Sequence, residues 1–262
     1  MARVNFDTDA FSCALREGTH NEGRIFENHC HPEYELIAVL EGRVSVVIEG
    51  DKISLSRGEA AIIPPLRYHS VYTEGGSNYR RVTALFGAEL IPIEIRGDFL
   101  KKSELTPVVS HPTLMPILDL IRATLLEDEL SKYESLVSSC LVQVLYVHTY
   151  KQSRSYEAKT DPRVKQITEY IDTHLTERVT LDGIAEHLFV SKSTVCHIFR
   201  EEMKITVKQY VLQKKLSYAA MLIGEGASAA DAAAAIGYEN YANFYKIYKK
   251  NFGASPRRMK QR

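Results

Sequence analysis

The stretch G-Y-E-N-Y-A-N-F-Y-K-I-Y-K-K-N-F-G-A-S-P, residues 237–256, predicts a tight turn followed by an amphipathic helix. Gly237-Tyr238-Glu239 supplies the turn, and Asn240 is a residue type that caps helix N-termini. Apolar side chains then recur at helical spacing and are expected to face a core: Phe244, Ile247, Tyr248 and Phe252. The opposite, exposed face carries Tyr241, Ala242, Tyr245, Lys246 and Lys249.

Another helix is predicted immediately before this turn. Ser228 is a favourable N-cap for an alanine-rich segment that runs to Ile236. Two short helices joined by a tight turn, with the small residue Ala233 inside the first, are typical of a helix-turn-helix unit.

The same pattern occurs once more upstream. Thr180 caps L-D-G-I-A-E-H-L, Phe189-Val190 forms the turn, and Ser191 caps K-S-T-V-C-H-I-F-R-E-E. We expect three residues of this second helix to face inward, Val195, Ile198 and Phe199, and four to face outward, Ser193, Cys196, His197 and Arg200. A single polar helix face is usually only solvated, but two such units favour contacts with DNA bases and phosphates.

A long helix is predicted between the two units, opened by the capping box Thr206-x-x-Gln209. Its 17 residues would span ~25 Å. A rigid spacer of this length could place two recognition helices in successive major grooves, which lie about 34 Å apart.

The charge of the chain is unevenly distributed. Residues 1–158 carry 16 basic against 22 acidic side chains, whereas residues 159–262 carry 17 basic against 11 acidic. The C-terminal part therefore has a net charge of +6, which suits a polyanion.

The region from about Val164 to Lys260 resembles the DNA-binding domain of the AraC/XylS family of bacterial transcription regulators. The motifs that carry this resemblance are I-A-E-H-L-F-V-S-K-S, I-F-R-E-E, K-L-S-Y-A-A-M-L-I and the stretch quoted first. The resemblance implies base contacts from Ser193, Cys196, His197, Tyr241, Ala242 and Lys246, and phosphate contacts from Lys192, Arg200 and Lys249. Three features depart from the family pattern: His197 stands where an arginine is usual, Lys204 where a glycine is expected, and Met259-Lys260 where a tyrosine-arginine usually follows the final Ser-Pro.

The N-terminal half has the period of strands instead. Short segments rich in β-branched residues follow one another from Tyr34 to about Phe86, separated by turns that contain glycine. This spacing is typical of an all-β sandwich or barrel. Two amphipathic helices are expected after residue 111, the second opened by the capping box Ser131-x-x-Glu134. Their apolar faces could pack on the β domain or pair with a second chain.

The β region contains H-C-H-P-E-Y-E, residues 29–35. Alternate residues of a strand share a face, so His29, His31 and Glu35 can point inward, and His69 can join them from a neighbouring strand. Three imidazoles and a carboxylate suit Zn, Ni, Fe or Mn. Polar groups that converge inside an apolar barrel equally suit a small-molecule effector such as a sugar. Arg16, Arg24, Tyr34 and Arg67 could assist an effector or lie at the surface.

This region resembles a cupin, which implies a β-barrel or jelly roll. The spacing of the first cupin motif is met by Gly23, His29, His31, Glu35 and Gly42, and that of the second by Gly58, Pro64 and His69. Leu66 replaces the glycine of the second motif and Thr73 its asparagine. Cupin domains fused to AraC-type DNA-binding domains often keep the H-x-H-x-x-x-E pattern as part of a ligand pocket, so the resemblance does not imply a metal and no cofactor is certain. His111, His148 and His174 lie outside the cluster, and we expect them to cap helices or lie at the surface.

The composition of the chain indicates its cellular compartment. No apolar run is long enough to cross a bilayer, no signal peptide opens the chain, and four separated cysteines favour a reducing compartment, so we expect a cytoplasmic protein. The predicted division is a cupin-like effector-binding domain at 1–110, a dimerising helix pair at 111–151, a linker at 152–160 and a DNA-binding domain at 161–262.

The leading hypothesis is therefore a homodimeric, effector-responsive transcription regulator without enzymatic activity or membrane contact. A metal-dependent cupin enzyme fused to a DNA-binding domain is the alternative.

Overall fold

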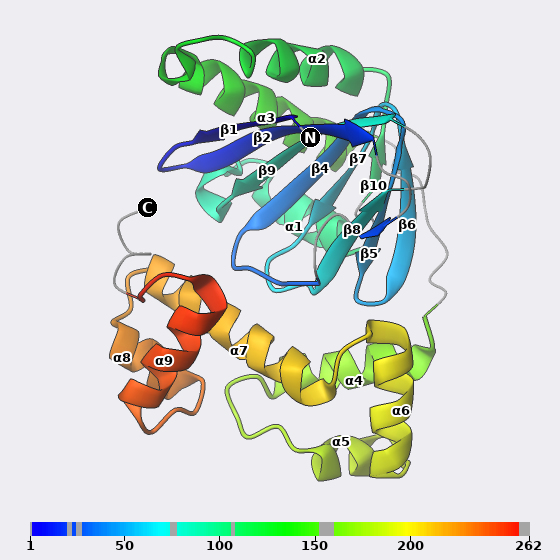
Figure 1. Cartoon of the computed structure of the whole chain (residues 1–262), viewed down its shortest axis with the longest axis vertical. Helices are drawn as coiled ribbons and strands as arrows, with labels where there is room; N and C mark the ends of the chain where they lie inside the picture. The colour runs from blue at the N-terminus through cyan, green and yellow to red at the C-terminus, as the bar shows by residue number, and fades with distance from the viewer. Residues whose placement is uncertain are drawn as a thin grey trace.

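The computed structural model describes residues 2–19, 23–24, 28–73, 78–105, 108–151 and 160–256. Two domains are present, an N-terminal one of two β-sheets with helices and a C-terminal one of helices alone, as expected from the sequence (Figure 1). The predicted linker at 152–160 lies outside the described residues apart from Thr160. Within the described part of the chain, no helix is long and apolar enough to cross a membrane.

The N-terminal domain contains a six-stranded sheet, in the order β1-β2-β9-β4-β7-β10, and a four-stranded sheet, in the order β3-β8-β5-β6. The strands are β1 Ala2–Asp7, β2 Phe11–Thr19, β3 Gly23–Arg24, β4 Tyr34–Glu41, β5 Arg43–Ile48, β6 Asp51–Ser56, β7 Glu59–Ile63, β8 His69–Thr73, β9 Asn78–Phe86 and β10 Val108–Ser110. Every strand pair within these sheets is antiparallel. Strands between Tyr34 and Phe86 were expected from the sequence, and the structure adds β1, β2, β3 and β10.

The six-stranded sheet is the middle layer of this domain, because alternate residues of its strands face two different cores. On β4, Leu36 and Ala38 face a core shared with helices, whereas Ile37 and Val39 face a core shared with the four-stranded sheet. On β1, at the edge of the sheet, and on β2 beside it, by contrast, the positions on this side are mainly polar: Asn5, Asp7, Ser12 and Arg16, with Ala14 among them. The space between the sheets is therefore apolar at one end and polar at the other.

Helices α1 Arg96–Leu105, α2 Leu114–Thr124 and α3 Glu134–Tyr150 belong to the N-terminal domain. Apolar residues of all three helices belong to the core on one face of the six-stranded sheet. The predicted helix pair therefore packs on the β domain. The predicted capping box at Ser131 and Glu134 is wrong. Residues Leu130–Tyr133 form a 3-10 turn that runs into α3, whose N-cap Tyr133 makes no side-chain cap hydrogen bond.

His148 lies on α3 and was expected to cap a helix or lie at the surface, but it is completely buried. Its ring packs edge-on against Phe99 with centroids 5.5 Å apart. The helical period places it on the apolar face of α3, and that position, rather than the polarity of imidazole, decides its environment.

The C-terminal domain contains α4 Pro162–Thr173, α5 Leu181–His187, α6 Lys192–Met203, α7 Val207–Gly224, α8 Ala229–Ala235 and α9 Tyr241–Phe252. The predicted N-caps are confirmed at Thr180, Ser191, Ser228 and Asn240, whose side chains each accept a backbone N–H of the first turn. Asp161 caps α4 in the same way. The capping box at Thr206 and Gln209 is also confirmed.

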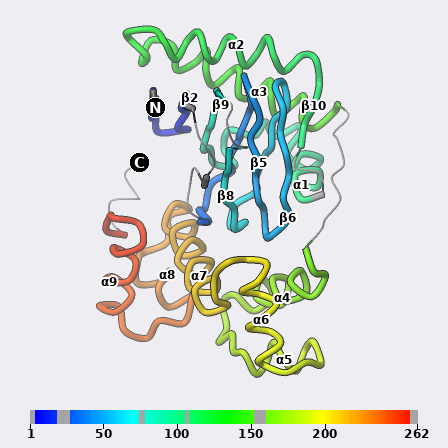
Figure 2. The backbone as a smooth tube through the Cα atoms, turned by 45° about the vertical axis from the view of Figure 1, so that its right-hand side comes forward, coloured from blue at the N-terminus to red at the C-terminus, as the bar shows by residue number. Residues whose placement is uncertain are grey.

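Helix α7 connects two small cores. Its first half packs with α4, α5 and α6, and its second half packs with α8 and α9. Figure 1 and Figure 2 show α7 between these two groups of helices, on the opposite side of the molecule from α2. The two helix-turn-helix units are thus α5–α6 and α8–α9, as the sequence predicts.

Candidate functional site

The four residues of the predicted cluster, His29, His31, Glu35 and His69, lie together in the structure, with one ligand atom of each within 4.8 Å of the others. The Oε2 atom of Glu35 is 2.7 Å from Nε2 of His69 and 3.2 Å from Nε2 of His31. Ring centroids of His29 and His69 are 4.4 Å apart. One carboxylate oxygen therefore contacts two of three neighbouring imidazoles.

The backbone brings these side chains together in a different way from the one expected. Glu35 lies on β4 and His69 opens β8, but His29 and His31 precede β4 and lie on no strand. Pro32 has no N–H to donate, which prevents the strand from continuing through this segment. Instead, His29 and His69 exchange two backbone hydrogen bonds of 2.9 and 2.8 Å as an isolated bridge.

The second nitrogen of two of these rings is anchored to the backbone. Nδ1 of His31 donates to the carbonyl of Glu33 over 3.0 Å, and Nδ1 of His69 donates to the carbonyl of Arg67 over 2.8 Å. Both rings are therefore oriented with Nε2 toward Glu35. A histidine that ligates a metal is commonly fixed by such a bond from its other nitrogen.

The charges within the cluster stabilise one another. Burial alone would raise the pKa of Glu35, but hydrogen bonds and charge from His31 and His69 outweigh it and hold that pKa well below its usual value. Burial alone would lower the pKa of His31, but hydrogen bonds to Glu33 and Glu35 raise it to about 9. In the absence of a bound ion, Glu35 is therefore ionised and His31 protonated at neutral pH.

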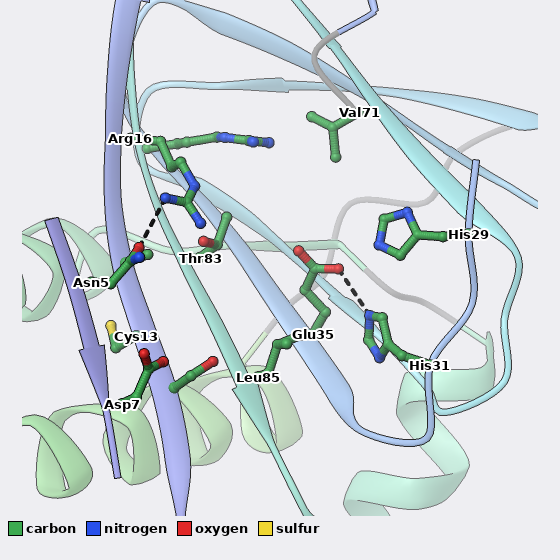
Figure 3. A pocket seen from close by; sticks show the side chains of 13 residues that line it. Asn5, Asp7, Cys13, Arg16, His29, His31, Glu35, Val71, Thr83 and Leu85 are labelled. Atoms are coloured by element: carbon green, nitrogen blue, oxygen red, sulfur yellow. Dashed lines mark hydrogen bonds and ion pairs between the residues drawn. The ribbon is translucent and has the colours of Figure 1, made fainter. Parts of the chain in front are cut away.

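A pocket of about 250 Å³ opens beside the cluster, at the polar end of the space between the sheets. Figure 3 shows His29, His31 and Glu35 on one side of it and Arg16 on the other. Its remaining lining comes from β1, β2, β8 and β9: Asn5, Asp7, Ser12, Cys13, Ala14, Val71, Arg81, Thr83 and Leu85. Strands β1 and β2, which were not expected from the sequence, therefore supply much of one wall.

The four residues proposed to assist an effector lie in different environments. Arg16 lines the pocket. Tyr34 is buried on the helix-facing side of β4, stacked on Phe86. Arg67 is ion-paired with Glu104, and the side chain of Arg24 lies outside the described part of the structure.

Arg81 was missed by sequence reasoning. It stands inside Y-R-R-V-T-A-L-F, where Arg80 and Arg81 look alike, and only the direction of each side chain separates them. Arg80 is half exposed and pairs with Glu17, whereas Arg81 is buried beside the pocket. The alternation along β9 could have identified it. Val82 and Ala84 are apolar and face the helices, so Arg81, which precedes Val82, faces the opposite side of the sheet.

The segments that carry the histidines also contact the core of the C-terminal domain. Cys30, between His29 and His31, and Tyr68, directly before His69, are both buried in the core formed by α4, α5, α6 and α7. The ring of Tyr68 packs edge-on against Tyr210 of α7, with centroids 5.6 Å apart. Neighbouring residues of the same two segments thus face the pocket and the DNA-binding domain.

Glu49, in the turn between β5 and β6, makes a polar contact between the domains. Its Oε1 accepts the backbone N–H of Tyr68 over 2.8 Å, and its Oε2 accepts the hydroxyl of Tyr210 over 2.7 Å. Burial and the charges of Glu49 and Asp172 raise the pKa of Tyr210 well above its usual value, so its hydroxyl keeps the proton it donates. Lys214 is buried 3.9 Å from Glu49 and 2.5 Å from Asp172.

The nine residues implied to contact DNA lie on exposed faces of the second helix of each unit. They are Lys192, Ser193, Cys196, His197 and Arg200 on α6, and Tyr241, Ala242, Lys246 and Lys249 on α9. The apolar residues of the same helices are buried, among them Val195, Phe199, Phe244 and Tyr248. Both faces are thus open to a ligand as large as DNA.

Two family models match the chain. A model described as an AraC-like ligand binding domain matches residues 13–145, and one described as a helix-turn-helix domain matches residues 184–262.

Curated relatives are similar along most of the chain. The uncharacterized HTH-type transcriptional regulator YdiP of Escherichia coli is 25% identical over 241 residues, which are 87% of this chain and 79% of that protein. The probable transcriptional regulator LumQ of Photobacterium leiognathi is 23% identical over 94% of this chain and 95% of its own length. The arabinose operon regulatory protein of Escherichia coli is 27% identical over 47% of this chain and 43% of its own length.

Among solved structures, ToxT from Vibrio cholerae aligns with 95% of this chain and 97% of its own, at 12% identity and a TM-score of 0.42.

Proposed function

Because the chain belongs to the AraC family of transcription regulators, whose ligand-binding model matches more than half of it, we propose that it senses a small molecule in the pocket beside Glu35 and thereby changes how its two helix-turn-helix units bind DNA. Family membership makes the chain a DNA-binding regulator and not an enzyme. DNA and an effector are accordingly its partners. We propose that it acts in the cytoplasm, together with the DNA that it binds.

One observation carries this proposal: along residues 29–31 and 68–69, successive side chains contact the pocket and the DNA-binding domain in turn. His29, His31 and His69 contact one another beside the pocket, while Cys30 and Tyr68 are buried in the DNA-binding domain. A ligand that shifts the backbone of these two segments through the imidazoles therefore also shifts the contacts of Cys30 and Tyr68. A coupling of this kind needs no intermediate element between the sites.

A ligand can shift an arrangement of domains only if it binds one arrangement better than another. The contacts of Cys30, Glu49 and Tyr68 define the arrangement present in this structure. We propose that an occupied pocket weakens or strengthens these contacts and so changes the freedom of α6 and α9 to reach their grooves. The direction of the change decides whether the ligand activates or represses DNA binding.

Within the DNA complex, we assign base contacts to Ser193, Cys196, His197, Tyr241, Ala242 and Lys246, and phosphate contacts to Lys192, Arg200 and Lys249. Their exposure on the second helix of each unit supports this assignment. Small side chains dominate the α6 face, so DNA shape and phosphate contacts are expected to contribute much of its specificity.

The cluster is also suited to a divalent transition metal such as Zn, Ni, Fe or Mn, which we propose that it can hold. The fit rests on the donor set of three imidazoles and one carboxylate, and on the backbone carbonyls that orient His31 and His69. Bonds in such sites are about 2.0–2.2 Å, so donors on opposite sides of an ion lie about 4 Å apart. The 4.8 Å spread of the cluster is close to this value.

We further propose that the chain forms homodimers through the helix pair within residues 111–151, as part of the division into 1–110, 111–151, 152–160 and 161–262. Four large hydrophobic side chains of this region remain exposed, Leu120, Leu126, Leu136 and Tyr150. Sedimentation at micromolar concentration tests this proposal, since a monomer would contradict it.

The names of some relatives concern sugar operons, arabinose among them, which supports a carbohydrate as one class of effector. A pocket with several converging polar side chains suits such a molecule.

A genome-wide binding assay with and without candidate ligands tests the proposed function. Enriched sites are expected for the full-length chain, with occupancy that changes when the ligand is added. The double variant His197→Ala/Lys246→Ala, which changes one exposed residue in each unit, should lose these sites. Equal occupancy for the wild type and this variant would overturn the assigned reading faces, and an absence of enriched sites would overturn the function.

A further inference from the structure

Helix α7 of the DNA-binding domain contacts both histidine segments, residues 29–31 and 68–69. The hydroxyl of Ser217 donates a 2.9 Å hydrogen bond to the carbonyl of Cys30 and lies 3.3 Å from its thiol sulfur. On the other segment, the ring of Tyr68 packs edge-on against a buried tyrosine of α7. The docked DNA-binding domain therefore restrains both histidine segments at once.

The same two segments are also joined to each other beside the pocket. His29 and His69 exchange two backbone hydrogen bonds, and the N–H of Leu66 donates to the carbonyl of His31 over 2.9 Å. The donor atoms of the cluster come from these two segments and from Glu35 of β4. An ion held by this set would join three separate segments of the chain.

The donors are close to a coordinating arrangement while α7 is docked. Their atoms lie within 4.8 Å of one another, and donors on opposite sides of a transition-metal ion lie about 4 Å apart. Loss of docking would release the carbonyl of Cys30 and the ring of Tyr68, and so increase the freedom of the donors beside them. The docked arrangement should therefore bind a metal ion more tightly, which is the condition for an ion to shift this equilibrium.

Building on the metal binding and the regulatory function proposed above, we propose that a divalent transition metal is itself a regulatory ligand of this chain, which binds the cluster and holds the DNA-binding domain docked against the sensor domain. The effect is reciprocal, because linkage requires docking to raise the metal affinity by the factor by which the metal raises the docking constant. Couplings of this kind typically amount to about 5- to 150-fold.

The four cysteines of the chain report docking in the protein as it exists. Cys30 is buried against the DNA-binding domain, Cys13 and Cys140 are buried in the core between the six-stranded sheet and its helices, and Cys196 is exposed. EDTA-treated protein is exposed to iodoacetamide at rising Mn²⁺ concentration, and the modification of each cysteine is followed by peptide mass spectrometry. Mn²⁺ is the probe because it prefers harder ligands than thiolates.

The proposal makes a different prediction for each environment. Cys30 should react through local undocking, and therefore faster than Cys13 and Cys140, which require the sensor domain to unfold. Mn²⁺ should slow Cys30 by about 5- to 150-fold and then reach a plateau, because the undocked chain still binds the ion, though more weakly. The rates of Cys13 and Cys140 should continue to fall as Mn²⁺ rises, because unfolding releases the ion. Cys196 should react at one rate throughout.

Variants assign the effect to the cluster and to α7. Glu35→Gln removes a donor and should abolish the effect of Mn²⁺ on Cys30, whereas Glu94→Gln, at an exposed position of the same domain, should retain it. Without metal, Ser217→Ala should accelerate the reaction of Cys30 by about 5- to 150-fold, the range expected for loss of a buried hydrogen bond. Ser139→Ala is its matched control and should leave the rate unchanged. If Glu35→Gln fails to fold, the wild-type titration decides.

The inference is overturned if Mn²⁺ leaves the reaction of Cys30 unchanged or accelerates it, or if Cys30 follows Cys13 and Cys140 at every Mn²⁺ concentration. Protection of Cys30 that persists in Glu35→Gln also overturns it, since the ion then acts elsewhere. DNA binding is measured on the same preparations, with a site recovered by the genome-wide assay. Intact DNA binding without protection of Cys30 overturns this inference alone. Loss of DNA binding by the wild type overturns the proposed function instead.

Discussion

The hydroxyl of Ser217 donates a 2.9 Å hydrogen bond to the backbone carbonyl of Cys30. Ser217 lies on α7, which both helix-turn-helix units share, and Cys30 lies between two histidines of the cluster. Both residues are buried, so no solvent competes for this bond. Together with the contacts of Glu49, it connects the pocket to the helix that sets the spacing of the two DNA-reading helices.

Removing that hydroxyl should weaken the coupling between pocket and DNA. Ser217→Ala leaves the carbonyl of Cys30 buried without this donor, a loss of about 1–3 kcal/mol in the free energy of unfolding. We also expect the effector to change DNA affinity less in this variant than in the wild type. Fluorescence anisotropy with labelled operator DNA, with and without effector, measures the change. Ser139→Ala, which removes an exposed hydroxyl bonded within α3, is the control and should retain full coupling.

A divalent metal should stabilise the folded chain if the cluster binds it. A ligand present at 100 times its Kd and bound only by the native state adds about 2.7 kcal/mol to the free energy of unfolding. EDTA-treated protein should therefore show a higher Tm after addition of Zn²⁺ or Mn²⁺. Removing a metal donor, in Glu35→Gln or His69→Gln, should abolish the rise. His111→Gln changes a histidine outside the cluster and should keep it; an identical rise in all three variants would exclude the cluster as the site.

The burial of His148 makes stability depend on pH. Burial, with a smaller contribution from the charge of Lys102, lowers the pKa of His148 from 6.5 to about 4. Between these values the unfolded chain binds a proton that the folded chain does not, so stability present above pH 6.5 is lost as the pH falls toward 4. At pH 5 the loss should amount to about 2 kcal/mol.

Urea unfolding at pH 7.5 and pH 5 measures this effect. His148→Phe keeps a ring in the core and removes the titrating group, so its loss of stability on acidification should be smaller by about the same amount. His197→Gln, at an exposed position of α6, should behave like the wild type. An unchanged pH dependence in His148→Phe would contradict the assignment.

Much of the fold could be predicted because its signals are local. N-caps, turn glycines and the two periodicities act within a few residues, and they were sufficient for the helices of the C-terminal domain and the strands after Tyr34. The strands β1 and β2 also alternate, with Phe6, Cys13 and Leu15 facing the helices. This alternation is itself a strand signal that the sequence reasoning did not use, and the mainly polar residues of the other face line the pocket.

At two positions the backbone keeps the conformation that a family motif implies although the residue differs from the motif. Leu66 and Lys204 each stand where a family expects glycine, and both adopt the left-handed conformation, with φ of 62° and 59°. The motif therefore predicted the backbone correctly even where the residue had changed. The cluster could be predicted for the same reason, from spacing alone, whereas Arg81 required knowledge of which way a single side chain on β9 points.

Glycine at position 204 should accordingly stabilise the chain. Lys204 is the C-cap of α6, and a side chain there crowds the backbone at positive φ, at a cost of about 1 kcal/mol. Lys204→Gly removes this cost but increases the freedom of the unfolded chain, so we expect a gain of up to about 1 kcal/mol. The midpoint of urea unfolding measures it. Lys204→Ala retains a side chain and should show no gain, which separates backbone strain from loss of the lysine charge.

Phosphate contacts and base contacts of α6 and α9 can be distinguished by the salt dependence and the sequence preference of DNA binding. Lys249→Ala should weaken binding to all DNA sequences about equally and reduce the slope of log affinity against log salt by about one, because a phosphate contact is lost. His197→Arg should instead add a preference for guanine at one position of the site, since a guanidinium can bind its O6 and N7 together. Titrations at several salt concentrations, with a set of single-base variants of the operator, distinguish the two effects. A uniform change in both variants would remove His197 from the base-reading face, and a preserved salt slope in Lys249→Ala would remove Lys249 from the phosphate contacts.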